Sequence, residues 1–566
     1  MCGICGFVGP KDEDLLKRMC LAIKHRGPDQ SGEYILEGAS LGHRRLSIID
    51  LSEQARQPMH NEDSAVWMVM NGEIYNFHSL RKELVSSGHT FRSQSDSETI
   101  IHAYEEYGED FVTRLEGMFA LAIWDNRKNK LILCRDRIGI KPLYYAHVGL
   151  RLLFASEIKA LLEDKGLKRE INEDGFFQYL AFQCILTPET MFKGIHKLEP
   201  GSMLVFENNV LNKKRYWSVD EAKSEESSES EVASALIDAV KSHLVSDVPL
   251  GVLLSGGLDS SSIVAIMHEQ GIENIETFTV GFNQPDDELK FAREVSQRFG
   301  TKHHELIIKP QDLQDLIGKI VWHMDEPLAD GGAIATYLAA EKVREFVKVV
   351  LVGEGGDETL GGYNWHKLAS FPLSLLPQKV KKRLYFYFTT FYKGDSQVPF
   401  DTFLRLFEEK RNFLDSMSIF EIKNILPNSL LMKVDKMTMA HALEARVPFL
   451  DYKFLSVALG LSQSKKISFF STKIFLRNYM QNRLPPSVLR RRKHGFIVPI
   501  GRWLENELRD FAHDTLFSTQ AYLPAVLPRQ RIEGLFRKQK GLRAIENNAL
   551  LWKLLIFELW QRKYLR

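Results

Sequence analysis

Short runs in which apolar and polar residues alternate fill the chain from residue 1 to residue 217. Alternation with a period of two is typical of strands that bury one face, and the Gly, Asn and Asp residues between the runs indicate turns. Two stretches, 15–25 and 97–115, have the spacing of amphipathic helices instead. We therefore predict a layered α+β domain with the strand candidates LGHRRLSIID (41–50), AVWMVMNGEIYNF (65–77), MFALAIWD (118–125), KLILCRD (130–136), RLLFASE (151–157) and GSMLVFENN (201–209).

The pattern changes after residue 232, where short apolar runs alternate with helical stretches. The strand candidates are VPLGVLL (248–254), IETFTVGF (275–282) and VKVVLVG (347–353). Strands that alternate with helices predict a doubly wound parallel sheet, and beyond residue 375 the pattern is mostly helical. The Ser- and Glu-rich stretch 218–232 indicates a linker that leads into a helix. We therefore divide the chain into domains 1–217 and 232–566.

Composition and charge exclude several classes of protein. The chain has 566 residues, a net charge of +1 and five cysteines. The near-neutral charge gives no reason to expect nucleic acid or an anionic membrane as a partner. No apolar run approaches the roughly 20 residues of a membrane helix, and the first residues lack the pattern of a signal peptide. The few cysteines, odd in number, fit a reducing compartment, so we expect a cytoplasmic protein.

The stretch LLSGGLDSSSIVAI (253–266) carries the most information about chemistry. A strand that ends at Leu254 is followed by a Gly-rich turn, and Ser260 and Ser261 open a helix. Glycines let the backbone approach a phosphate, and the free N–H groups at a helix start favour an anion. Asp259 could hold a magnesium ion. The alternative is an ordinary capped turn, but the full S-G-G-L-D-S-S pattern resembles the pyrophosphate loop of the N-type ATP pyrophosphatases.

Three later stretches bear on the same site. In VGEGGDETLGGY (352–363), acidic residues could reach a magnesium ion or an acceptor substrate. The segment 435–451 has helical spacing, and its Arg446 and Asp451 could be structural ion-pair partners. LRRRKHGF (489–496) could be a solvated or nucleic-acid-binding patch. Next to an ATP site, however, a cation such as Lys493 can stabilise developing phosphate charge.

The first ten residues, MCGICGFVGP, form no obvious start to a core element. Cys2 and Cys5 could be a redox pair or half of a zinc site, but no second ligand pair with matching spacing is evident. If Met1 is removed, Cys2 gains an α-amine with a pKa of about 7.7–8.0. One residue then supplies both a nucleophile and a base.

Five further motifs follow Cys2 in order: HRGPDQSG (25–32), RRLSIID (44–50), NGEIYN (71–76), SDSE (95–98) and RDRIGIKPLYY (135–145). Separately, NGE could be a hairpin turn, SDSE a capping box and HRRLS a charged edge strand. Together with Cys2 they resemble the class II glutamine amidotransferase domains. That resemblance implies an αββα fold of the N-terminal-nucleophile type.

The resemblance also implies a role for each motif. Cys2 would attack the side-chain amide of glutamine, and Asn71 with the Gly72 N–H would form the oxyanion hole. Arg45 would bind the α-carboxylate of glutamine, and Asp96 with Glu73 would hold the α-ammonium. The glutamine-binding residues would be Arg45, Leu46, Ser47, Ile48, Ile49, Asn71, Gly72, Glu73 and Asp96.

A glutaminase domain joined to an SGGLDSS domain, with ASEIKAL (155–161), EPLAD (326–330) and VPFLD (447–451), resembles the glutamine-hydrolysing asparagine synthetase family. The resemblance implies that ATP adenylates aspartate and that ammonia from glutamine crosses an internal tunnel to displace AMP. The implied substrates are L-glutamine, L-aspartate and ATP with Mg²⁺, and a homodimer is possible.

By the same resemblance, Glu354 would support formation of the adenylate. From its place in the basic run, we expect Lys493 to act on the phosphates. Asp259 and Asp357 would hold the metal. The ATP-binding residues would be Leu254, Ser255, Gly256, Gly257, Asp259, Ser260, Val280, Val352 and Gly353.

One segment departs from the family pattern. After EPLA the family usually has D-P-S-x-I-P-T, whereas this chain has DGGAIAT (330–336). We expect a more flexible loop there, because glycine and alanine replace proline and serine. An alternative function is therefore an amidotransferase of the same family that acts on another carboxylate, of a glycan or a secondary-metabolite precursor. An idle binding protein and a simple glutaminase are further alternatives, against which the intact Cys2, Asp259 and Glu354 argue.

Overall fold

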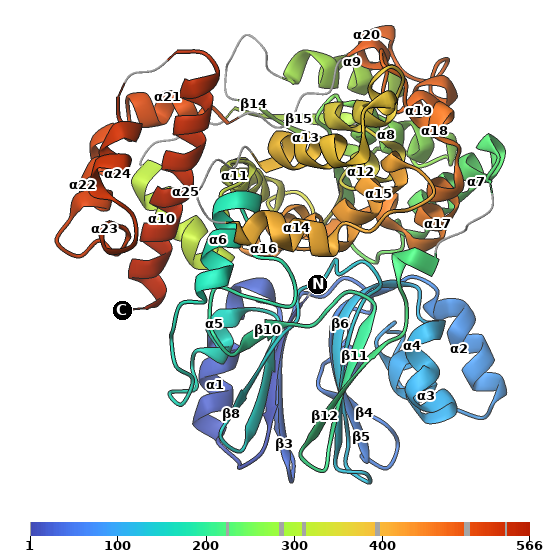
Figure 1. Ribbon diagram of the computed structural model, residues 1–566. Coiled ribbons are helices and arrows are strands. Elements are labelled where there is room, and N and C mark those ends of the chain that lie inside the picture. Colours follow the sequence, from blue (N-terminus) through green and yellow to red (C-terminus); the bar gives the residue numbers. More distant parts are fainter. Residues whose placement is uncertain are drawn as a thin grey trace.

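Two antiparallel sheets lie face to face in the N-terminal part of the chain (Figure 1). The computed structural model describes residues 2–221, 226–281, 288–307, 313–390, 397–491, 498–537 and 540–565. The first sheet consists, in spatial order, of β10 (Ile195–Lys197), β8 (Tyr144–Val148), β9 (Arg151–Ala155), β1 (Cys2–Val8), β3 (Ala39–Arg45) and β2 (Gln30–Ile35). The second consists of β12 (Val210–Arg215), β11 (Ser202–Glu207), β7 (Lys130–Arg135), β6 (Gly117–Asp125), β5 (Val66–Ile74) and β4 (Met59–His60).

Helices cover both outer faces of this sandwich. The helix α1 (Glu13–Ala22) packs on the first sheet, and α2 (Phe77–Ser86) and α3 (Glu98–Tyr107) pack on the second. Apolar side chains from both sheets fill the space between them, among them Ile4, Leu41, Val69, Ala122, Leu133 and Phe154. The predicted αββα sandwich is confirmed, and each strand candidate in 41–209 forms a strand.

The interpretation of the first ten residues was wrong. They contain β1, an interior strand between β9 and β3 whose residues Cys2–Phe7 are all buried. A Cβ on Gly6 would come within 2.3 Å of the Ser40 carbonyl oxygen of β3. The glycines therefore allow close packing, and they also hide the apolar alternation by which strands are found in a sequence.

The third sheet is parallel, as predicted. Its spatial order is β15 (Lys302–Ile307), β14 (Glu276–Gly281), β13 (Leu250–Leu253), β16 (Val349–Leu351) and β17 (Glu444–Arg446). One face packs on α7 (Glu229–Ser242), α8 (Leu258–Glu269) and α9 (Leu289–Phe299), and the other on α11 (Gly332–Val343) and α16 (Leu430–Met439). This arrangement confirms the doubly wound fold, in which ligands bind at the carboxyl ends of the strands.

Two local predictions need correction. The helical spacing of 435–451 continues only to Met439, where α16 ends, and the parallel strand β17 follows at 444–446. The helix after the Gly-rich turn, α8, begins at Leu258 with Gly257 as its N-cap. This is two residues before the expected start at Ser260. Asp259 therefore lies in the first helical turn.

The N-terminal and C-terminal parts of the chain are joined through α6 (Glu173–Phe182). The α6 helix packs on the C-terminal helix α25 (Leu542–Tyr564), in one core with residues from both ends of the chain. Phe176 and Phe557 have ring centroids 4.6 Å apart, and the Tyr179 hydroxyl donates to the Lys553 carbonyl at 2.7 Å. In the described part of the chain, no helix is both long and apolar enough to cross a bilayer.

Candidate active sites

Cys2 opens β1 and lies beside Asn71 of β5. The Cys2 backbone nitrogen donates to Asn71 Oδ1 at 3.0 Å, and 7% of the cysteine is exposed. Burial raises the pKa of the thiol, although the charge of Arg45 works in the opposite direction. The Asn71 side chain is fully buried, and its Nδ2 has no hydrogen-bond partner within the described residues. A buried amide donor left unsatisfied beside a thiol is an arrangement suited to an oxyanion.

Gly72 and two buried carboxylates continue this site along β5. A Cβ on Gly72 would lie 2.2 Å from the Met118 carbonyl oxygen of β6, so the sheet accepts only glycine there. Glu73 and Asp96 are each 4% exposed, and Asp96 Oδ2 accepts from the Ile74 nitrogen at 2.9 Å. Burial raises the pKa of both carboxyls. Two buried carboxyls in one place favour an arriving cation such as an ammonium group.

Arg45 holds the loop that follows β3. Its Nη1 donates to Gln30 Oε1 at 2.7 Å and to the Ser52 carbonyl at 3.1 Å, and its Nη2 donates to the Ile49 carbonyl at 3.2 Å. The loop residues Leu46, Ser47, Ile48 and Ile49 are all buried. Arg45 is the register partner of Cys2 in the pairing of β1 with β3, so it lies beside the Cys2 site, and the binding of glutamine by Arg45 and these loop residues stays a prediction.

The local alternatives for these motifs do not hold. Asn71, Gly72 and Glu73 lie inside β5 rather than in a hairpin turn, and β3 lies between β1 and β2 rather than at an edge. The SDSE segment forms no capping box, because the Glu98 carboxylate accepts from the backbone of residues 92 and 93 instead. In β1, Cys5 lies three residues from Cys2 and so points to the opposite face, where it contacts Cys20 at 3.5 Å.

The second candidate site is a cavity of about 380 Å³ at the carboxyl ends of β13, β14 and β16. Its volume falls within the range of small-molecule sites. Of the predicted ATP-binding residues, Leu254, Ser255, Asp259, Ser260, Val280, Val352 and Gly353 line it, together with Glu354. Gly256 and Gly257 do not. Gly256 instead has a φ of 62° and packs against α9, where a Cβ would meet the Ala292 nitrogen at 2.6 Å.

Asp259 and Asp357, the predicted metal ligands, share one lysine. Lys473 Nζ lies 2.6 Å from Asp259 Oδ2 and 2.6 Å from Asp357 Oδ1. Two glycines make room for these carboxylates, since a Cβ on Gly356 or Gly362 would lie 2.8 Å from Asp259 Oδ1 or 1.8 Å from Asp357 Oδ1. Carboxylate oxygens beside a cavity are ligands that magnesium accepts, so the residues fit the ion. No local motif in the sequence indicated a role for Lys473.

The segment DGGAIAT is not a loop. Residues 332–336 form the first turns of α11, and Asp330 receives a hydrogen bond from the Gly332 nitrogen at 2.8 Å. Asp330 also pairs with Lys433 at 2.6 Å, and both line the cavity. A Cβ on Gly331 would lie 2.1 Å from Ile500 Cδ1. Close packing therefore accounts for this glycine, and the expectation of a flexible loop was wrong.

Two other predictions concern the basic residues of the second domain. Arg446 pairs with Glu444 at 2.6 Å and lies 3.8 Å from Glu73, whereas Asp451 caps the helix α17 (Tyr452–Gly460). The predicted Arg446–Asp451 pair is therefore wrong. Glu444 and Arg446 alternate along β17 and so share one face of the strand, whereas the Asp451 carboxylate accepts from the backbone at the start of α17. Lys493 lies outside the described residues.

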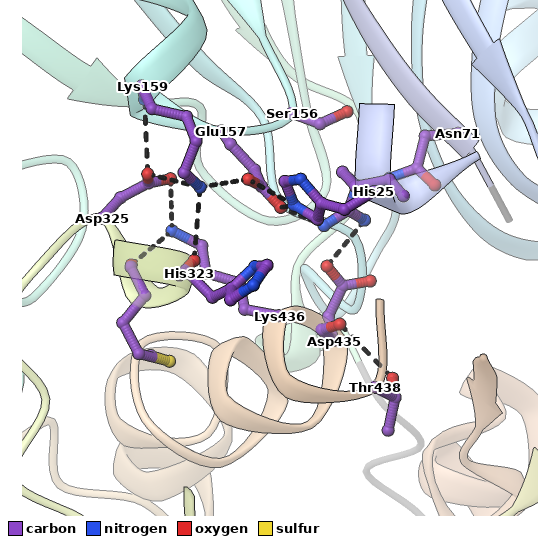
Figure 2. A network of polar contacts seen from close by, with 12 residues as sticks. His25, Asn71, Ser156, Glu157, Lys159, His323, Asp325, Asp435, Lys436 and Thr438 are labelled. Carbon is purple, nitrogen blue, oxygen red and sulfur yellow. Dashed lines mark hydrogen bonds and ion pairs between the residues drawn. The ribbon is translucent and has the colours of Figure 1, made fainter. Parts of the chain in front are cut away.

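Buried ion pairs connect the two sites (Figure 2). Arg26 is fully buried, and its Nε donates to the Cys2 carbonyl at 3.0 Å. The same guanidinium pairs with Glu157 and with Asp435 of α16, each at 2.8 Å. Two residues earlier on α16, Lys433 lines the cavity. Hence a single side chain contacts both the Cys2 backbone and the helix that lines the second site.

A second set of ion pairs lies beside it and also crosses between the domains. Lys159 pairs with Asp325 at 2.7 Å, and Lys436 of α16 pairs with the same carboxylate at 2.9 Å. Asp325 also accepts from the Ile158 nitrogen at 2.9 Å. The motifs ASEIKAL and EPLAD, which are far apart in the sequence, thus meet through Asp325, the residue before EPLAD.

Comparisons with known proteins agree with this two-site arrangement. A family model described as asparagine synthase matches residues 231–562, and one described as a glutamine amidotransferase domain matches residues 1–217. Asparagine synthetase [glutamine-hydrolyzing] 1 of Bacillus subtilis is 34% identical, over 98% of this chain and 96% of the relative. Asparagine synthetase 3 of the same organism is 33% identical, over 87% and 86%. Asparagine synthetase 2 of Arabidopsis thaliana is 33% identical, over 92% and 82%. By these matches along nearly its whole length, the chain belongs to the glutamine-hydrolysing asparagine synthetase family.

Proposed function

We propose that this chain converts aspartate to asparagine, with glutamine as the source of ammonia and ATP as the activating substrate. Family membership implies the use of ATP. One observation carries the proposal: Arg26 joins the Cys2 backbone to Asp435, on the helix that lines the cavity beside the S-G-G-L-D-S-S turn. That contact supports the proposal because it connects Cys2, the proposed nucleophile, with the helix beside the proposed phosphate-binding turn.

The proposed first reaction is hydrolysis of glutamine. Once Met1 is removed, the nitrogen that lies 3.0 Å from Asn71 Oδ1 becomes an α-amine, which takes the thiol proton of Cys2. The sulfur attacks the side-chain amide, and Asn71 Nδ2 with the Gly72 N–H donates to the oxyanion. Ammonia leaves, and water hydrolyses the thioester to glutamate. Arg45 binds the α-carboxylate, and Glu73 and Asp96 bind the α-ammonium.

The proposed second reaction takes place in the cavity. A β-carboxylate oxygen of aspartate attacks the α-phosphorus of ATP, and pyrophosphate leaves. Ser255, Ser260 and the N-terminus of α8 bind the departing phosphates. Leu254, Val280, Val352 and Gly353 contact the nucleotide, and Glu354 supports the adenylate. Ammonia then attacks the acyl carbon and AMP leaves, which gives asparagine; Lys493 is proposed to stabilise phosphate charge.

Asp259 and Asp357 are the proposed ligands of a magnesium ion. When bound, the ion would neutralise charge on the phosphate oxygens. Lys473 supplies positive charge between these two carboxylates in the structure described here. The Lys473 side chain must therefore either contact the carboxylates together with the ion or move away from them when the ion binds.

Ammonia is proposed to travel inside the protein. In bulk water at neutral pH it would be protonated and lose its nucleophilicity. A small interior cavity is lined from both domains, by Leu143 and Tyr144 of the first and by Pro427 and Met432 of the second. Met432 lies on α16, the helix that also contacts Arg26 through Asp435.

The test is pyrophosphate release by the purified chain with Mg-ATP and glutamine, with and without aspartate, followed by mass identification of the product. Aspartate-dependent pyrophosphate with asparagine formed is the expected result. Asp259→Asn is the matched control and should reduce pyrophosphate release while glutamine hydrolysis continues. Glutamine hydrolysis without aspartate-dependent pyrophosphate would instead favour another carboxylate acceptor.

Three broader expectations accompany this proposal. The division into domains 1–217 and 232–566 is supported by the strand content of each part, with antiparallel sheets in the first and the parallel sheet in the second. A cytoplasmic location and a homodimer stay predictions, which cell fractionation and light scattering would test.

A further inference from the structure

Two histidines and a glutamate meet on the outer side of the second sheet, where α2 is connected to α3. His89 lies in the connection 87–97, and His102 and Glu105 lie on α3. One ligand atom from each of the three residues lies within 4.8 Å of the other two. The rings of His89 and His102 have centroids 5.1 Å apart. Neither candidate active site uses these residues.

The distances are close to those of a metal centre. Glu105 Oε2 lies 3.2 Å from His102 Nδ1 and 4.0 Å from His89 Nδ1. Zinc bonds of about 2.0–2.1 Å in a tetrahedron separate the ligand atoms by roughly 3.3 Å. His102 and Glu105 already meet this spacing, and His89 would have to move closer to Glu105 to complete the set. Three protein ligands leave the fourth position open to water.

Each ligand is also held through its other polar atom. Glu105 Oε1 accepts from Asn61 Nδ2 at 2.6 Å. His89 Nε2 lies 3.2 Å from a Glu106 carboxylate oxygen, and His102 Nε2 lies 3.8 Å from Glu98 Oε1. Metal-binding histidines characteristically direct their second nitrogen to a carboxylate, which fixes the tautomer and the ring orientation. An ordinary surface ion pair does not require this second layer of contacts.

Charge and access both favour a cation here. Carboxylate oxygens of Glu98 and Glu105 lie 3.8 Å and 3.2 Å from the ring nitrogens of His102, so negative charge surrounds the group. The His102 side chain is 2% exposed, whereas those of His89 and Glu105 are 16% and 18% exposed. An ion could therefore reach the group from solvent and still be partly shielded.

We propose that His89, His102 and Glu105 bind one divalent transition-metal ion of the zinc type. Imidazole and carboxylate ligands in a four-coordinate site suit zinc and cobalt better than magnesium or calcium. The ion would tie the connection 87–97 to α3. Because that connection contains Asp96, the metal would hold a residue of the Cys2 site in place from the outside.

The test is titration of the full-length Cys2→Ala protein with Co²⁺ alone, followed by visible absorption. The Cys2 substitution removes a thiol that could itself bind the metal. One equivalent of tetrahedral Co²⁺ is expected, and Zn²⁺ should displace it. His89→Gln should weaken binding at least about tenfold, since even partners of ligands contribute that much. His78→Gln, at an exposed histidine on α2, is the matched control and should bind as tightly as the parent.

A second variant, together with a test of folding, distinguishes loss of metal binding from misfolding. Glu105→Gln keeps an acceptor for Asn61 but removes the charge, and circular dichroism shows whether each variant folds. Loss of the tetrahedral spectrum in both folded variants supports the site. Equal affinity of the parent and either folded variant, or no tetrahedral Co²⁺ in the parent, would overturn the proposal. The readout is independent of enzymatic activity. A failure of the metal proposal can therefore be distinguished from a failure of the proposed function.

Discussion

Arg26 and Asp435 form a buried ion pair at 2.8 Å although 409 positions separate them in the sequence. Arg26 belongs to the HRGPD segment that contacts the Cys2 backbone, and Asp435 lies on α16 beside the cavity of the other domain. Removal of one partner from a buried pair leaves the other charge uncompensated. The contact therefore makes the geometry of the Cys2 site depend on a residue of the second domain.

We expect Asp435→Asn to reduce the glutaminase rate about tenfold, because Arg26 loses its anchor and the Cys2 backbone shifts. The free energy of unfolding should fall by about 2–4 kcal/mol, since Glu157 still compensates part of the charge. Glutamine hydrolysis without ATP and urea unfolding measure the two effects. Asp514→Asn, whose side chain is 85% exposed, is the control and should change neither. An unchanged glutaminase rate in a folded Asp435→Asn protein would refute the dependence.

Cys2→Ala is expected to abolish asparagine synthesis from glutamine and to spare synthesis from added ammonia. The substitution removes the sulfur that attacks the amide but leaves the cavity intact. Both syntheses can be followed by asparagine formation under the same conditions. Cys5→Ala, which alters the opposite face of β1 near Cys20, should retain glutamine-dependent synthesis. If Cys2→Ala abolished both syntheses, the assignment of the two reactions to separate sites would be wrong.

Lys473→Met should increase the response of the protein to magnesium. The lysine neutralises Asp259 and Asp357, so its removal leaves two carboxylates that repel each other until a cation arrives. Methionine preserves the length of the side chain, and either residue adopts the φ of 53° at this position with similar strain. Mg²⁺ is therefore expected to raise the melting temperature of the variant more than that of the parent.

The control for this experiment is Lys465→Met, at a lysine whose side chain is 53% exposed and pairs with Glu229. Its response to Mg²⁺ should match that of the parent. Equal responses in all three proteins would mean that Lys473 and the ion do not share the same carboxylates.

The stability of the chain should depend on pH through Glu358, which lines the cavity. Burial and the charge of Asp357 raise the pKa of this carboxyl from its ordinary 4.5 to about 7. The folded state thus binds the proton more tightly, and this contribution is fully present below pH 4.5 and is lost as the pH rises to 7. Glu358→Gln removes the dependence, so the variant should gain stability relative to the parent across that window. Urea unfolding at several pH values measures it.

The matched substitution is Glu345→Gln, where the side chain is 60% exposed. Its stability relative to the parent should not vary across the same window. A constant difference between Glu358→Gln and the parent at every pH would contradict the raised pKa.

Regular patterns in the sequence were enough to predict most strands and the two fold types. Eight of the strands in the described residues were not predicted, namely β1, β2, β4, β8, β10, β12, β15 and β17, and three of these show the physical reasons. The glycines of β1 obscure alternation, β15 reads KHHELI and is mostly polar, and β17 is three residues long with two charges. Elements whose stability comes from packing with distant parts of the chain carry little local signal.

In the candidate sites too, some residues were predictable from local motifs and others were not. Cys2, Asn71, Glu73 and Asp96 were predicted from local motifs, and the structure places them at one end of the two sheets. The partnership of Lys473 with Asp259 spans 214 positions, and no short pattern records it. The ion pairs of Arg26, Asp435 and Asp325 are likewise products of the assembled fold. Sequence motifs thus predict which groups carry the chemistry, and the fold determines what holds those groups in place.

The contact between α6 and α25 has a consequence for how the protein is made. Domains generally begin to fold from the N-terminus while the ribosome is still adding residues. Phe176 and Tyr179 of α6 pack on Phe557 and Lys553 of α25, and 374 positions separate Tyr179 from Lys553. The side of α6 that carries Phe176 and Tyr179 therefore stays uncovered until α25 has been translated. Transiently exposed apolar surface is prone to aggregation, so we expect this side of α6 to be a binding site for chaperones until α25 emerges.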